Sequence, residues 1–142
     1  MPRPYLLVYA LLATGHVGAV EWDHDANLAG AVGDFLAAYE AGGLPQAEKI
    51  AADCQQSIAA IKDDLQRFMR FEYCSGLEFS GYLTNRRDMD EKGSPPSEYF
   101  ALEGIQYRLD RLSDYITNPV AHTQVLNAWG RSVAGELDRR LK

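Results

Sequence analysis

Two cysteines, Cys54 and Cys74, place the strongest constraint on how this chain can fold. An even number of cysteines in a secreted protein favours a disulfide, and two cysteines allow only one intramolecular pairing. A disulfide holds its Cα atoms about 6 Å apart, whereas a continuous helix of about twenty residues would separate them by about 30 Å. If the cysteines bond, the chain must therefore reverse direction between Ala59 and Tyr73.

The first nineteen residues, MPRPYLLVYALLATGHVGA, differ in composition from the rest of the chain. Arg3 precedes an apolar run that is shorter than the roughly 20 residues needed to span a bilayer. Val17 and Ala19 are the small residues that a signal peptidase accepts before a cleavage site. A buried amino-terminal helix is the alternative. We expect residues 1–19 to be a signal peptide and residues 20–142 to be a periplasmic or secreted domain that does not associate with membranes.

Apolar residues after the predicted signal peptide recur with the helical period. Leu28, Val32, Phe35, Leu36 and Tyr39 share one helix face, which Gly42-Gly43 would end. Further stripes extend from Ile50 to Met69, from Ile105 to Ile116 and from Leu126 to Leu137. No segment alternates apolar and polar residues as a strand would. The sequence predicts an all-α, single compact domain of four to five helices with one disulfide.

The segment TNRRDMDEKGSPPS, residues 84–97, is the clearest predicted loop. It is rich in charge, contains a glycine and two prolines, and has almost no apolar residue. Ser97 is a candidate amino-terminal cap for the helix that follows it. Asn118-Pro119 has the cap-then-proline order expected at the start of the last helix.

Composition and motifs favour a binding protein over a catalyst. The formal net charge is −6, which makes nucleic acid a poor partner, because such binding calls for clustered lysine and arginine. The cysteines lack the paired spacing of a zinc site, and Asp23-His24-Asp25 lies too near the mature terminus to be a convincing metal cluster. No common hydrolase or phosphate-binding motif is present. We therefore predict no catalytic residue, no metal ligand and no cofactor.

Three short segments resemble a known family. They are DCQQSIAAI around Cys54, YCSGLEFSGYL around Cys74, and DYITNPVAH at residues 114–122, followed by an apolar helix. In this order they resemble the small periplasmic immunity proteins of type VI secretion amidases, the Rap/Tai-type inhibitors. The best matches are Gly81-Tyr82-Leu83 and residues 115–119, within a resemblance that covers residues 50–140. The chain lacks the second cysteine pair often present in that family, and Asn118 stands where histidine is usual.

The resemblance implies a non-enzymatic inhibitor that occludes the active site of a peptidoglycan amidase, often as a homodimer. The predicted loop would then be the occluding element, with its polar side chains as partner contacts. Those residues are Arg86, Arg87, Asp88, Asp90 and Glu91. Two other functions stay open from the residues alone. One is a small secreted enzyme or effector with an unrecognised site, and the other is a general periplasmic structural or stress protein.

Overall fold

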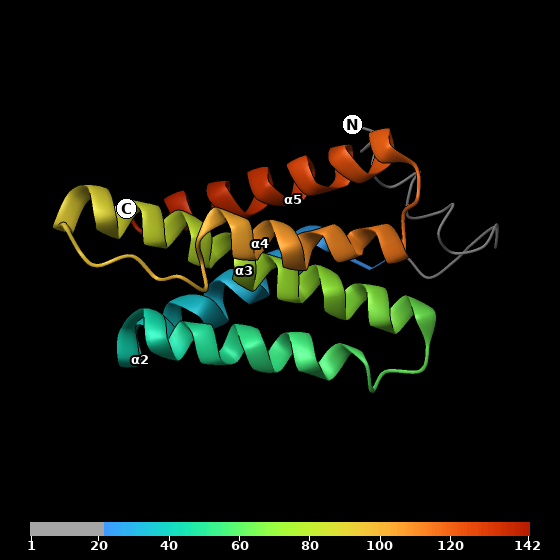
Figure 1. Ribbon diagram of the computed structural model, residues 1–142, viewed down its shortest axis with the longest axis horizontal. Coiled ribbons are helices and arrows are strands. Elements are labelled where there is room, and N and C mark those ends of the chain that lie inside the picture. The colour runs from blue at the N-terminus through green and yellow to red at the C-terminus, as the bar shows by residue number, and fades with distance from the viewer. Residues whose placement is uncertain (1–21) are drawn as a thin grey trace.

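The computed structural model describes residues 22–142, and in that part of the chain every regular element is a helix (Figure 1). The elements in order are α2 (His24–Ile58), α3 (Asp64–Lys92), α4 (Leu102–Leu109), the 3₁₀ helix η1 (Asp110–Asp114) and α5 (Pro119–Arg140). The predicted all-α class is confirmed. The predicted signal peptide at residues 1–19 lies outside the described residues.

The helix α2 contains the break that the sequence predicted. Its start is capped by Asp23, whose side chain accepts a hydrogen bond from the Ala26 amide at 3.0 Å. The backbone leaves helical geometry at Gly42 and Gly43, and Gly43 has a φ of 69°, which a residue with a side chain rarely adopts. Pro45 follows this bend, where it does not interrupt the first half. In Figure 1 the two halves of α2 diverge from the bend at the lower left.

The helix α3 is the centre of the fold, because it packs against α2, α4 and α5. Two glycines let its neighbours approach closely. A Cβ atom at Gly76 would lie 2.7 Å from the Ala31 methyl group, and one at Gly81 would lie 2.1 Å from the Phe100 ring. The glycines of the YCSGLEFSGYL segment therefore serve packing on two sides of one helix.

An aromatic cluster joins α3 to the last part of the chain. The ring of Trp129 on α5 lies 5.9 Å from Phe68 and 6.0 Å from Phe71. Tyr115 contacts the same two rings at 5.2 and 5.4 Å. The start of α5 confirms the predicted cap, since the Asn118 side chain accepts hydrogen bonds from the Val120 and Ala121 amides.

The prediction of a loop over residues 84–97 is wrong for most of its length. The helix α3 continues to Lys92, and the loop begins only at Gly93, which has a left-handed backbone (φ 62°) and caps the helix. Thr84, Asn85 and Asp88 are buried against neighbouring segments, whereas Arg86 and Asp90 are exposed. The charges that indicated a loop therefore belong to a helix, where most are exposed and Asp88 is buried.

Two smaller expectations also need correction. Ser97 does not cap α4, whose first residue is Leu102; its hydroxyl accepts a hydrogen bond from the Phe100 amide within the preceding turn. The helix expected over 105–116 is α-helical only to Leu109 and then tightens into η1. Leu112 and Ile116 nevertheless reach the core, as their spacing predicted.

Candidate functional site

The two cysteines form the predicted disulfide. The Cys54 and Cys74 Cα atoms are 5.6 Å apart, and both side chains are buried. The chain reverses at residues 59–63, inside the predicted interval, and α3 returns beside the second half of α2. Cys74 lies in the interior of α3. Neither sulfur is a free thiol, so a cysteine nucleophile is excluded here.

The five residues predicted to contact a partner all lie on the last two turns of α3. Arg86, Asp90 and Glu91 are exposed, and the Arg86 guanidinium lies 3.2 Å from the Tyr82 hydroxyl. Arg87 is half-buried and pairs with Asp88 at 3.4 Å. The structure thus gathers these residues at one end of a helix, although they do not all face solvent.

Asp88 differs from the other four because it is only 5% exposed. Its carboxylate accepts a hydrogen bond from the Tyr39 hydroxyl on α2 and forms an ion pair with Lys92 at 3.2 Å. Burial alone would raise the pKa of Asp88, but the hydrogen bonds from Tyr39 and Lys92 outweigh it and hold that pKa below its usual range. Asp88 therefore fixes the end of α3 onto α2 and has little surface to offer a partner.

A second carboxylate, Glu72, is buried in the contact between α2 and α3. His24 Nδ1 lies 2.7 Å from Glu72 Oε2, and the Trp22 indole donates to Oε1 at 2.8 Å. Asn27 donates to the same oxygen at 3.0 Å. The Asp23-His24-Asp25 segment is therefore held against α3, because His24 is buried at 3% exposure. The only sequence signal for Glu72 was its place one turn after Phe68 on an apolar face.

A third buried carboxylate, Glu78, lies where α3 meets α4. Arg108 Nη2 is 2.8 Å from Glu78 Oε2, and the Tyr99 hydroxyl donates to Oε1 at 3.0 Å. The Arg108 guanidinium also stacks on the Tyr99 ring at 3.7 Å from its centroid. Burial raises the pKa of Glu78, and the nearby Arg108 charge opposes that effect. This network fastens α4 to the central helix.

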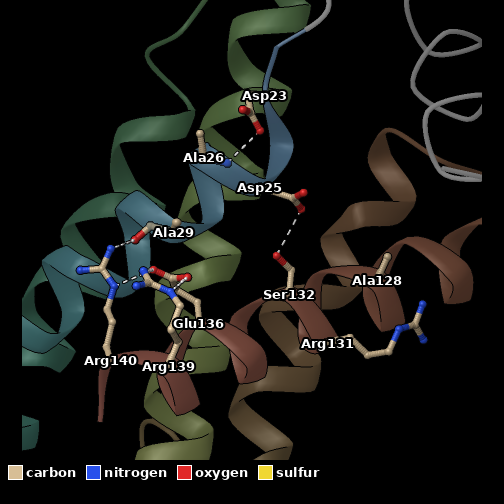
Figure 2. A pocket seen from close by; sticks show the side chains of 10 residues that line it. All are labelled: Asp23, Asp25, Ala26, Ala29, Ala128, Arg131, Ser132, Glu136, Arg139 and Arg140. Carbon is tan, nitrogen blue, oxygen red and sulfur yellow. Dashed lines mark hydrogen bonds and ion pairs between the residues drawn. The ribbon is translucent and has the colours of Figure 1, made fainter. Parts of the chain in front are cut away.

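The open pocket in Figure 2 lies between the start of α2 and the second half of α5 and has a volume of about 720 Å³. Small side chains on both helices leave this space, because Ala26, Ala29 and Ala128 lie where larger residues would fill it. The polar lining residues are Asp23, Asp25, Arg131, Ser132, Glu136, Arg139 and Arg140. Sequence reasoning missed this pocket, since its two walls are about a hundred residues apart in the chain.

The charges of the pocket are distributed by helix. The acidic wall comes from α2, where Asp25 accepts a hydrogen bond from Ser132 at 3.4 Å. The basic wall comes from α5, where Arg139 and Arg140 both hydrogen-bond to Glu136 and lower its pKa to about 2. Arg140 also donates to the Ala29 carbonyl at 3.4 Å, which ties the two walls together (Figure 2).

Over residues 22–142, no group of three His, Cys, Asp or Glu side chains could hold a metal ion. None of the helices in that range is long and apolar enough to cross a membrane.

Comparisons with known proteins found no match of any kind. No protein-family model, no curated protein and no solved structure is significantly similar to this chain.

Proposed function

We propose that this chain is a binding protein of an oxidising, extracytoplasmic compartment. The disulfide supports this compartment, because such bonds persist where thiols are not kept reduced. The apolar segment with small residues at its end, residues 1–19, supports export. On this proposal the mature protein begins at Val20, and intact-mass measurement of protein recovered from the periplasm should show that start.

More specifically, we propose that it is an immunity protein that inhibits a cell-wall amidase by occluding its active site. The resemblance of residues 50–140 to the Rap/Tai-type inhibitors motivates this function. The observation that carries it is the outer face of the last turns of α3, called here the α3 tip: Arg86, Asp90 and Glu91. This tip lies at one end of the molecule, where the yellow part of α3 extends beyond the other helices in Figure 1.

The α3 tip is suited to insertion because it is held rigidly. The Asp88 network ties it to Tyr39, and Asn85 exchanges hydrogen bonds with the Ser97 backbone at 2.8 and 3.0 Å. A rigid element loses less conformational entropy on binding than a mobile loop does. We therefore propose that the occluding element is a preorganised helix end, followed by the loop of residues 93–101, and not a loop over residues 84–97.

The proposal is tested by binding and inhibition assays with oxidised protein comprising residues 20–142. It is mixed with candidate peptidoglycan amidases, and capture, affinity and residual hydrolysis are measured. We expect tight capture with loss of amidase activity. Absence of capture by every amidase, with the disulfide formed, would contradict the immunity function and favour the general structural or stress role.

Charge reversal then tests the α3 tip. The double variant Arg86→Glu/Asp90→Lys should weaken amidase binding at least tenfold with little change in melting temperature, because both side chains are exposed. The matched control, Asp110→Lys/Arg111→Glu, changes exposed charges on η1 and should bind like the wild type. Equal affinities of the two double variants would show that the tip is not the occluding element.

A further inference from the structure

We propose that the pocket between α2 and α5 binds a short peptide or amino acid with a free amine and a free carboxylate. This inference is independent of amidase inhibition, because the pocket residues do not include the α3 tip. The volume of about 720 Å³ lies within the range of pockets that hold small ligands, roughly 300–1,000 Å³. Its charge pattern decides which small ligand fits.

The acidic end of the pocket is suited to an ammonium group. Asp23, the amino-terminal cap of α2, and Asp25, in its first turn, both line the pocket with carboxylates. The Ser132 hydroxyl bonds to Asp25 and supplies a further polar contact across from α2. An anionic ligand group would be repelled here, whereas an amine would gain charge-assisted hydrogen bonds.

The basic wall is suited to a carboxylate. Arg139 and Arg140 share the single negative charge of Glu136, so these three side chains carry a net positive charge. Arg131 adds another guanidinium, and it makes no hydrogen bond or ion pair with any residue in the described range 22–142. Arginine binds carboxylates through two parallel N–H groups, which makes Arg131 the principal candidate for the ligand carboxylate.

The lining as a whole favours a ligand of both signs over a simple anion or cation. Three acidic side chains and three arginines line the pocket. The two aspartates lie on the α2 wall and the arginines on the α5 wall, where Glu136 is paired with Arg139 and Arg140. A ligand with two negative charges would be repelled by Asp23 and Asp25, and one with two positive charges would be repelled by Arg131. A zwitterion whose amine faces the aspartates and whose carboxylate faces the arginines pairs with both walls, and the small side chains of Ala26, Ala29 and Ala128 leave room for its middle.

Calorimetric titration of oxidised residues 20–142 with tetra-alanine in four forms tests the proposal. The forms have both ends free, the amine acetylated, the carboxylate amidated, or both ends blocked. We expect the free form to bind and each single block to weaken binding about tenfold or more, the usual effect of removing one charge-assisted contact. No binding of the free form at millimolar concentration, or equal binding of the doubly blocked form, would overturn the proposal.

Variants of the lining residues test which wall of the pocket binds the carboxylate of the peptide and which binds its amine. Arg131→Gln should weaken only peptides with a free carboxylate, and Asp25→Asn only peptides with a free amine. Ala26→Phe should block the pocket without touching its charges, and Ala37→Phe, at another exposed alanine of α2, is the matched control. Thermal melts check that each variant is folded. Unchanged binding by folded Ala26→Phe would place the ligand elsewhere and contradict the proposed site.

Discussion

At the scale of single residues, the close packing around α3 depends on the absence of side chains. Gly76 and Gly81 lie on different faces of the helix, and each is buried against a neighbour. Glycine in a helix costs roughly 1 kcal/mol relative to alanine. That cost is offset here by the burial of Phe100 and by the close approach of α2.

Alanine at Gly81 should therefore destabilise the protein. Its Cβ would lie 2.1 Å from the Phe100 ring, so the ring or the helix must move, and we expect a loss of about 1–3 kcal/mol in the free energy of unfolding. Gly30→Ala is the matched control: a Cβ there meets nothing within 4 Å, and it should stabilise by about 0.5–1 kcal/mol. Urea denaturation measures both, and equal effects would mean that Phe100 does not restrict position 81.

Glu136 provides a pH-dependent contribution to stability. Arg139 and Arg140 lower its pKa from 4.5 to about 2 in the folded protein. A lowered folded pKa gives stability that is present above the unfolded value and lost as the pH falls through the folded value. Because Arg139 and Arg140 are 68% and 36% exposed, we expect their ion pairs with Glu136 to contribute less than about 1 kcal/mol to the free energy of unfolding.

The variant Glu136→Gln should be less stable than the wild type at pH 7 and indistinguishable from it near pH 2. Urea denaturation across this range measures the difference, with Glu103→Gln, at an exposed position of α4, as the control. A difference that stays constant with pH would show that the ionised carboxylate is not its source.

At the scale of elements, the disulfide and the buried carboxylates join the same helix to different neighbours. The Cys54–Cys74 bond and the Glu72 network link α3 to α2, while Glu78 links it to the segment that includes α4. Charged groups at such depth specify which helix faces meet, because a shifted packing would leave them unpaired in a low-dielectric interior.

Removing the disulfide should weaken the α2–α3 pair. The bond closes a loop across a sequence separation of 20, which corresponds to about 3 kcal/mol in the chain-entropy model. We expect Cys54→Ala/Cys74→Ala to lose about that much free energy of unfolding relative to the oxidised wild type. The free energy of unfolding of this variant should differ little from that of the reduced wild type. A large difference would show that packing of the cysteine side chains, and not the crosslink, causes the loss.

At the scale of the whole molecule, one continuous core includes residues from α2, α3, α4, η1 and α5. Its members run from Leu28 near the start of α2 to Leu137 near the end of α5. No element within residues 22–142 has a separate core of its own, so partial unfolding of one helix would expose the apolar surface of the others.

We therefore expect the oxidised domain to unfold in a single cooperative transition. In the variant Trp22→Phe, tryptophan fluorescence comes from Trp129 alone, which is 1% exposed and reports on the contact between α3 and α5, whereas far-ultraviolet circular dichroism reports on all helices. The two signals should give the same urea midpoint. Separate midpoints would show that α5 can leave the remaining helices folded.

The sequence by itself determined the helical class, the reversal between the cysteines, the bend at Gly42-Gly43 and the start of α5. These features follow from local rules, namely the 3.6-residue period, backbone capping and the short reach of a disulfide. The tertiary structure decided that α3 continues to Lys92, that Glu72 and Glu78 are interior, and that a pocket with acidic and basic walls lies between the start of α2 and the second half of α5. The physical reason is distance along the chain: Asp88 is stabilised by Tyr39, and Asp25 meets Ser132. Such partners are known only once the helices are packed.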